Sequence, residues 1–296
     1  MYRQLIGFND EIIDVALLTS AQSSEHIALA ANSSLIRIYS TESLDARLLT
    51  GHSGIVLSLA ANSSGRMLAS GSKDNSARVW ASQNTELGWG CVATCEGHAE
   101  SVGTVVFERD DVPRYLFTGS QDRTIKVWDL SGVPAEAHDN STPVRCRSVS
   151  TTRAHEKDIN ALDSSPGGAL LVSGSQDKTA KVWAVDRSSG MLKLLGTCKG
   201  HKRGVWSVRF ARGTRTLATG SGDRTVRLWR LDDFSCLKVF EGHANSVLRV
   251  DWLGGEKEPH GQLVSAAADG LVKVWDSRTE ECVTTLDGHE DKVREM

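Results

Sequence analysis

Short runs of alternating apolar and polar residues occur throughout the chain, and turn-forming residues separate them. The stretch at residues 200–229 is representative. Apolar residues alternate with polar ones through Val205, Val208 and Phe210, and two further apolar runs follow, the last ending at Trp229. Glycine and aspartate lie between these runs. Alternation with a period of two over four to seven residues, bounded by turn residues, predicts β-strands joined by tight turns.

The same arrangement recurs at fixed spacing. Counting back from a closing tryptophan, an aspartate lies six residues earlier and a serine or threonine ten residues earlier, with a histidine further ahead. The sets are His52, Ser70, Asp74 and Trp80; His98, Thr118, Asp122 and Trp128; His155, Ser173, Asp177 and Trp183; His201, Thr219, Asp223 and Trp229; and His243, Ser265, Asp269 and Trp275. Such a period indicates stacked or radially arranged copies of one sheet unit.

An additional repeat at the start, from Gln4 to Tyr39, keeps the apolar positions and loses the polar ones. Phe8 replaces the histidine, Leu29 the hydroxyl residue and Ser33 the aspartate. We expect this degenerate unit to fold as the others do.

The recurring Ser/Thr, His and Asp residues raise two interpretations. Together they could form the nucleophile, base and orienting acid of a hydrolase. However, the set occurs in five repeats, the chain has no Gly-x-Ser-x-Gly motif, and each aspartate lies in a predicted tight turn. Because polar groups buried between sheets must be paired, we expect a structural lock in every unit: aspartate accepts from backbone near histidine, histidine contacts the hydroxyl, and the hydroxyl accepts from the indole N–H. We predict no catalytic residue, no cofactor and no metal site.

Composition fits a folded protein with a large core. The 296 residues are 40% hydrophobic and 24% charged, with five prolines. No apolar run has membrane-spanning length, and Met1–Gln4 begins no hydrophobic signal core. We therefore expect a soluble intracellular protein that binds neither a membrane nor a small-molecule substrate.

Cysteines and insertions change this picture little. Five of the six cysteines lie three or seven residues before a histidine of the repeat, so we expect them to pack on equivalent strands of different units rather than to cluster as ligands. Residues 131–147 depart from the pattern and contain two prolines, which predicts an exposed insertion. A smaller insertion is predicted at 254–261.

The spacing of Gly-His, Asp and Trp or Trp-Asp, as in Trp128–Asp129 and Trp275–Asp276, resembles the WD-repeat β-propeller family. The resemblance implies an all-β fold of four-stranded antiparallel blades, in which each repeat supplies the outer strand of one blade and three inner strands of the next. We expect residues 1–296 to form a single propeller domain. It would have six complete repeats, closing at about 39, 80, 128, 183, 229 and 275, and residues 282–296 would supply an outer strand and the start of a seventh.

A narrower resemblance is carried by residues 4–15, 154–160, 200–208, 235–250, 268–275 and 287–293, which are similar to the second propeller of the transducin-beta-like protein three family. This implies a nucleolar scaffold of the small-subunit processome, which processes pre-ribosomal RNA. The implied partners are other WD-repeat processome subunits, ribosome-assembly proteins, and pre-ribosomal RNA or a small nucleolar RNA particle. The chain lacks the family's first propeller, most of its seventh blade and its C-terminal helical region, and has Arg294 where the family has tryptophan.

A ubiquitin-ligase substrate receptor is the alternative interpretation, since such a receptor would use the same fold and the same rim. It would normally bring an adaptor-binding helical motif, which this chain does not display.

Partner-binding positions follow from the repeat register. In propellers the Gly-His loops and the Asp turns share one rim, so residues near them point to that face. The predicted partner-binding residues are Ile55, Leu57, Lys73, Asn160, Lys202, Arg203, Trp206, Arg224 and Leu248. The alternative is that the apolar members line the channel and pack on one another. Residues 199–230 carry many cations and one acid, Asp223, which also makes RNA contact through Lys202, Arg203 and Arg224 a hypothesis.

Overall fold

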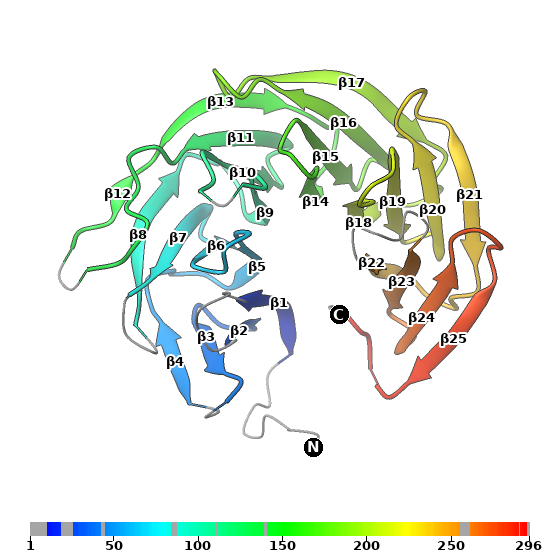
Figure 1. The fold of residues 1–296 in the computed structure, drawn as a ribbon, viewed down its shortest axis with the longest axis horizontal. Coiled ribbons are helices and arrows are strands. Elements are labelled where there is room, and N and C mark those ends of the chain that lie inside the picture. Colours follow the sequence, from blue (N-terminus) through cyan, green and yellow to red (C-terminus); the bar gives the residue numbers. More distant parts are fainter. Residues whose placement is uncertain are drawn as a thin grey trace.

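The computed structural model describes residues 11–18, 26–42, 45–83, 88–110, 112–138, 141–254, 261–289 and 291–294. Within these ranges every regular element is a β-strand, and the strands form six antiparallel sheets around a common centre (Figure 1). Each sheet runs outward from its first strand, so the sheets are the blades of a propeller. The predicted all-β propeller of four-stranded blades is confirmed.

The blades follow the chain in order. Blade one contains β1 (Ile12–Leu18), β2 (His26–Ala31), β3 (Ile36–Ser40) and β4 (Ala46–Leu49). Blade two contains β5 (Val56–Ala61), β6 (Met67–Ser72), β7 (Ser76–Ser82) and β8 (Trp89–Glu96). Blade three contains β9 (Val102–Phe107), β10 (Tyr115–Ser120), β11 (Thr124–Asp129) and β13 (Arg147–Arg153). Blade four contains β14 (Ile159–Ser164), β15 (Leu170–Ser175), β16 (Thr179–Val185) and β17 (Leu192–Lys199). Blade five contains β18 (Val205–Phe210), β19 (Thr216–Ser221), β20 (Thr225–Arg230) and β21 (Cys236–Glu241). Blade six contains β22 (Val247–Leu253), β23 (Gln262–Ala267), β24 (Leu271–Asp276) and β25 (Cys282–Asp287).

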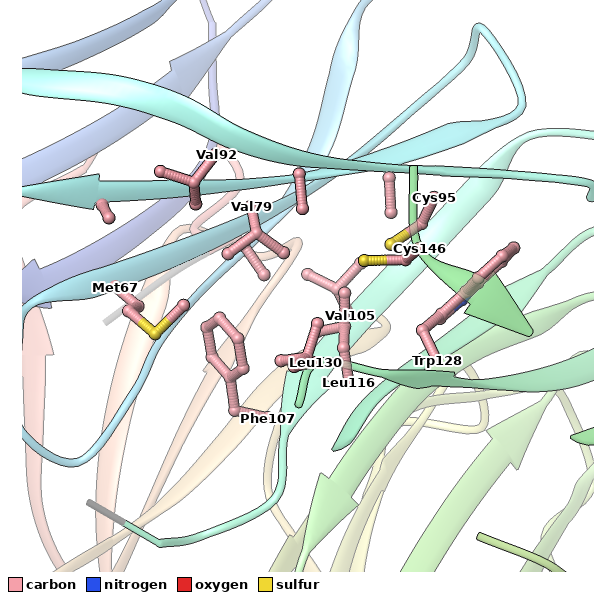
Figure 2. Packing of buried hydrophobic residues seen from close by; sticks show 14 of the residues in the cluster. Met67, Val79, Val92, Cys95, Val105, Phe107, Leu116, Trp128, Leu130 and Cys146 are labelled. Carbon is pink, nitrogen blue, oxygen red and sulfur yellow. The ribbon is translucent and has the colours of Figure 1, made fainter. Parts of the chain in front are cut away.

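Apolar side chains fill the space between neighbouring blades. Between blades two and three, Val79 packs toward Val105, Phe107 and Leu116, and all four are at most 4% exposed (Figure 2). The alternation in the sequence makes this possible, because every second residue of a strand points to one face of its sheet. Among the described residues, such a core lies between each pair of consecutive blades from blade one to blade six, rather than at the centre of the ring.

Polar side chains also tie each innermost strand to the next. Ser58 Oγ accepts from the amide of Val105, 3.3 Å away, and Ser207 Oγ accepts from Val250 N at 3.1 Å. The equivalent position in blade four is Ala161, which has no acceptor. There Asp163, two residues further along, accepts from Phe210 N at 2.8 Å. A displaced carboxylate therefore provides in blade four the link that a hydroxyl provides in blades two and five.

The insertion at 131–147 is exposed over most of its described length, as predicted, but it is docked against blade two at two points. A two-residue strand within it, β12 (Val144–Arg145), pairs in parallel with β8, so a segment leaving blade three becomes a fifth strand of blade two (Figure 1). Ala137 and Cys146 are buried at 6% and 7% exposure. These two side chains cover apolar surface at the outer edge of blade two, whereas most of the other described residues of the insertion are exposed. We refer to residues 131–147 as the strap.

The ends of the described chain lie near the centre. Residues 291–294 return inward from β25, and Val293 N donates to Ala267 O at 3.1 Å (Figure 1). Arg294, noted above as a difference from the family pattern, contacts the Glu11 carboxylate at 3.0 Å, and Lys292 contacts the same carboxylate at 2.8 Å. The Lys292 hydrogen bond holds the pKa of Glu11 below its usual range, against the effect of burial. Phe8 of the first repeat and residues 255–260 of the second insertion lie outside the described residues.

Candidate partner-binding rim

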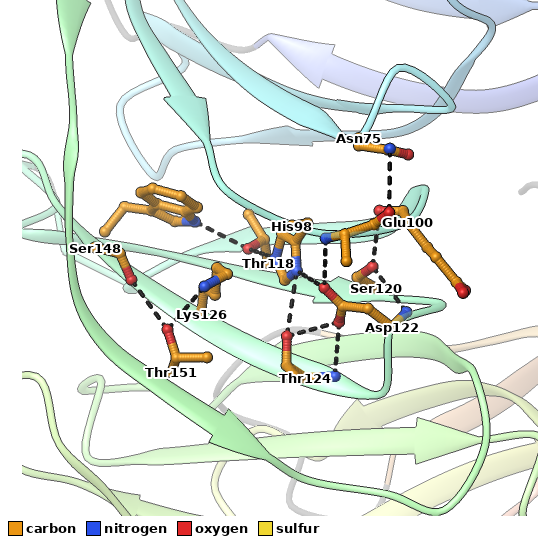
Figure 3. A network of polar contacts seen from close by, with 12 residues as sticks. Asn75, His98, Glu100, Thr118, Ser120, Asp122, Thr124, Lys126, Ser148 and Thr151 are labelled. Carbon is orange, nitrogen blue, oxygen red and sulfur yellow. Dashed lines mark hydrogen bonds and ion pairs between the residues drawn. The ribbon is translucent and has the colours of Figure 1, made fainter.

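Each of the five polar sets forms one hydrogen-bonded chain beneath the Gly-His rim. In blade three, Trp128 Nε1–H donates to Thr118 Oγ1 at 2.9 Å, and His98 Nδ1 lies 2.8 Å from the Asp122 carboxylate (Figure 3). Because the carboxylate accepts from Nδ1–H, Nε2 is left as an acceptor for the Thr118 hydroxyl proton, at 2.7 Å. The chain thus runs from indole through hydroxyl and imidazole to carboxylate, with each donor matched to an acceptor.

The same contacts recur in the other four sets. Each pairs histidine Nδ1 with the aspartate, histidine Nε2 with the hydroxyl, and the indole N–H with that hydroxyl; the sets are those of Trp80, Trp183, Trp229 and Trp275. In blade one, Leu29 and Tyr39 cannot form such a chain, but Ser33 Oγ still accepts from Leu35 N at 3.2 Å, so the turn survives without its aspartate.

The aspartates are held as anions. Burial alone would raise the pKa of Asp122, but hydrogen bonds from His98 and Thr124 outweigh it, so the pKa lies well below its usual range. The pKa values of Asp74, Asp177, Asp223 and Asp269 are lowered by the same balance. At His243 burial dominates and lowers the pKa, despite the opposing Asp269 carboxylate. Hydroxyl, imidazole and carboxylate are each committed to partners, which is the arrangement of a lock between a turn and a strand.

A β-bulge aims one residue of each innermost strand at this rim. In blade five, Val205 pairs with Ser221 and Ser207 with Gly220, so Trp206 is the extra residue between them. Leu57, Asn160 and Leu248 lie at the same bulge in their blades. A bulged residue is released from the ladder and its side chain is redirected. The alternation of apolar and polar residues in the sequence does not reveal the bulge. The bulge is nevertheless what turns these predicted residues toward the rim.

The predicted partner residues differ in how available they are. Trp206 is 39% exposed, whereas Ile55, Leu57 and Leu248 are half-buried. Asn160 is engaged within the fold, because its amide donates to the Val205 carbonyl of the next blade at 2.9 Å. Lys73, Lys202, Arg203 and Arg224 are exposed.

Trp206 has its position because Gly222 lies beside it. A Cβ on Gly222 would be 3.1 Å from Trp206 Nε1 and 3.4 Å from Arg203 Cβ. The same turn position carries a side chain in the other complete repeats: Lys73, Gln121, Gln176 and Ala268. Only blade five therefore leaves room for an indole against this turn. The repeat register places Gly222 on this rim as well, but the prediction did not include its contact with Trp206.

Cations gather at the same place. The residue after each lock aspartate adopts a left-handed backbone conformation, and in three successive blades it is an exposed cation: Arg123 (φ 71°), Lys178 (φ 75°) and Arg224 (φ 71°). In blade two this position is Asn75, whose amide donates to Ala99 O of the next Gly-His loop at 3.3 Å (Figure 3). Lys202 is the equivalent of Ala99, so the repeat register sets Lys178 beside Lys202. Sequence reasoning named Lys202 and missed Lys178, because the two lie in different blades.

Several cations on the opposite rim are paired with carboxylates. There Arg187 contacts Glu108 at 2.8 Å and Asp110 at 2.9 Å, and Arg215 contacts Asp232 at 2.7 Å. Arg109 contacts the buried Asp163 at 3.1 Å. Among the described ion pairs, none includes Lys178, Lys202, Arg203 or Arg224. On the Gly-His rim, blade five therefore carries cations without a described carboxylate partner near an exposed indole.

Among the described residues, no group of histidine, cysteine or carboxylate side chains has the arrangement of a metal site. The same part of the chain contains no helix long and apolar enough to cross a bilayer.

The polar locks, the blades and the rim define a WD-repeat propeller, a fold that presents loops for binding. Comparison with family models matches the WD domain, G-beta repeat, at residues 45–81, 89–129, 146–184, 192–230 and 234–276. These matches cover more than half of the chain, so the chain belongs to this family.

Among individual proteins, the chain is similar to Transducin beta-like protein 3. It is 42% identical to the Mus musculus protein over 187 residues, which is 62% of this chain and 23% of that protein. The Bos taurus protein is 42% identical over 198 residues, covering 66% of this chain and 24% of that protein. The U3 small nucleolar RNA-associated protein 13 of Saccharomyces cerevisiae is 37% identical over 174 residues, covering 54% and 21%. The matched segments therefore span about a quarter or less of these relatives.

Proposed function

We propose that this chain is a binding module of a non-catalytic scaffold in ribosome biogenesis, acting in the small-subunit processome during pre-ribosomal RNA processing. The binding role is supported by one arrangement above all: the exposed indole of Trp206, seated against Gly222 and surrounded by cations without carboxylate partners. Exposed tryptophan and arginine residues are the side chains most often found at the energetic centre of interfaces.

The assignment to ribosome assembly is supported by similarity to Transducin beta-like protein 3 and to a protein whose name associates it with U3 small nucleolar RNA. The nucleolus is the location that follows from this proposal. The partners would be other WD-repeat subunits and assembly proteins of the processome.

Purification of the tagged protein from its cells, with identification of the proteins and RNA that accompany it, tests this assignment. We expect processome proteins and precursor ribosomal RNA. Recovery of ubiquitin-ligase subunits without them would contradict the proposal and favour a substrate receptor. Comparison with a Trp206→Ala variant identifies which partners depend on the rim.

Direct RNA contact by Lys202, Arg203 and Arg224 is a separate part of the proposal. Replacing all three with glutamate should reduce RNA crosslinking and flatten the dependence of RNA affinity on salt, because fewer counterions are released from phosphates. The matched control replaces Arg147, Lys193 and Arg212 with glutamate; these cations are exposed and lie away from the Gly-His rim. Equal effects of both triple variants, or no effect of the first, would contradict specific contact at this rim.

A further inference from the structure

Two cysteines that are far apart in the sequence lie side by side at the junction of blades two and three. Cys95 is on β8, and Cys146 directly follows β12 in the strap. Their sulfur atoms are neighbours (Figure 2). Both side chains are buried, with exposures of 0% and 7%.

The strand pairing explains this proximity. Val144 pairs with Ala93 and Arg145 with Thr94 in parallel register, and Cys146 N donates to Thr94 O at 2.8 Å. The next pair in this register is Cys146 with Cys95, so their side chains leave the same face of the sheet. Neighbouring strands are about 4.8 Å apart, and disulfides form between Cα atoms about 4.4–6.8 Å apart. The two backbones therefore allow a disulfide without a large movement.

The surroundings make the two thiols unequal. The hydrogen bond between them lowers the pKa of Cys146 against the effect of burial, whereas it raises the pKa of Cys95 together with burial. Cys146 is also the more exposed of the two. By contrast, burial raises the pKa of Cys198 to about 12.

We propose that Cys95 and Cys146 are a site of reversible oxidation, at which a hydroperoxide converts the two thiols into a disulfide that fastens the strap to blade two. The Cys146 thiolate attacks the peroxide O–O bond and becomes a sulfenic acid, and the other peroxide oxygen leaves as water after protonation. The Cys95 sulfur then attacks the sulfenic sulfur, the S–O bond breaks, and a second water leaves. Two thiols and one molecule of hydrogen peroxide thus give one disulfide and two molecules of water.

The strap leaves blade three after β11 and returns to it at β13, so the disulfide ties the outer edges of two successive blades. It also closes a loop that contains β9, β10 and β11. A cross-link over a loop of this size restricts the unfolded chain strongly, so the oxidised protein should have a Tm about 5–10 °C above that of the reduced protein.

The test is to treat the folded, reduced protein with hydrogen peroxide, block free thiols in denaturant, and map the peptides by mass spectrometry. We expect a peptide pair linked through Cys95 and Cys146 that thiol reductants separate, and a Tm that rises on oxidation and falls on reduction. Cys146→Ser and Cys95→Ser should each abolish the linked pair and the shift. Cys91→Ser is the matched control, because Cys91 is on the same strand but its thiol donates to Ala93 O at 3.5 Å. It should retain both effects.

Peptide mapping of the unaltered protein decides the question even if a serine variant fails to fold. Recovery of both cysteines as free thiols after peroxide treatment would overturn the proposal. Links confined to the exposed Cys236 and Cys282 would overturn it as well.

Discussion

Trp206 and Gly222 lie against each other on the rim of blade five, with the indole Nε1 3.1 Å from the position that a Cβ of Gly222 would occupy. The bulge in β18 turns the indole toward this rim, and the absent side chain leaves space for it. Partner binding should therefore depend on Gly222 as well as on Trp206.

Replacing Gly222 with glutamine, the residue found there in blades three and four, should displace the indole. We expect recovery of the partners that depend on Trp206 to fall about tenfold or more, since a central tryptophan contributes about 2 kcal/mol or more at an interface. The free energy of unfolding should change by less than about 1 kcal/mol, because the atoms that must move are the exposed side chains of Trp206 and Arg203. Ala268→Gln, at the same position in blade six, is the control for both measurements. Normal partner recovery with Gly222→Gln would show that the indole position is unimportant.

The lock of blade three can be broken at its central hydroxyl. Thr118→Val keeps the shape but leaves the Trp128 indole N–H and the His98 imidazole without their shared partner. We expect a loss of about 2–4 kcal/mol in the free energy of unfolding, measured by urea denaturation. Thr152→Val, on the half-exposed outer strand of the same blade, should cost less than about 0.5 kcal/mol. Similar losses for the two variants would mean that the lock contributes little.

Acid should destabilise the propeller through the lock aspartates. Their pKa values are lowered in the folded protein, so the stability they contribute is present above the unfolded value of about 3.9 and is lost as pH falls toward the folded values. The urea midpoint should thus fall between about pH 4 and pH 2. Asp122→Asn should make this fall shallower, because one titrating group is removed. A midpoint that is constant over this range would contradict the assignment.

Two aspartates on the opposite rim should differ widely in their effect on stability. Asp163 is 1% exposed, accepts from Phe210 N and contacts Arg109, so Asp163→Ala leaves the buried Phe210 amide without an acceptor and the half-buried Arg109 without its carboxylate. We expect a loss of about 3–5 kcal/mol. Asp251 is exposed and contacts Arg209 at 3.3 Å, so Asp251→Ala should cost about 0.2–1 kcal/mol. Urea denaturation of both variants measures the difference, and equal costs would contradict the assigned role of Asp163.

The fold was predictable because the strand period and the Trp, Asp and hydroxyl spacing repeat locally, within one blade. Features that join different blades were not. The pairing of Val144 with Ala93 involves two residues without any periodic signal, and the exchange of Ala161 for Asp163 is visible only once Phe210 is known to lie opposite. On the rim, the repeat register places both Trp206 and Gly222, whereas their contact depends on the bulge in β18, and the position of Lys178 beside Lys202 required knowledge of which turns meet between blades.

The pairing of β12 with β8 changes how blade two faces other molecules. An outermost strand normally offers unpaired backbone amides and carbonyls, to which an extended segment of another polypeptide can add as a further strand. Along Ala93–Thr94 those groups are already satisfied by the chain itself. Blade two is therefore closed to strand addition at this position, and the chain supplies in cis the strand that a foreign peptide would otherwise provide.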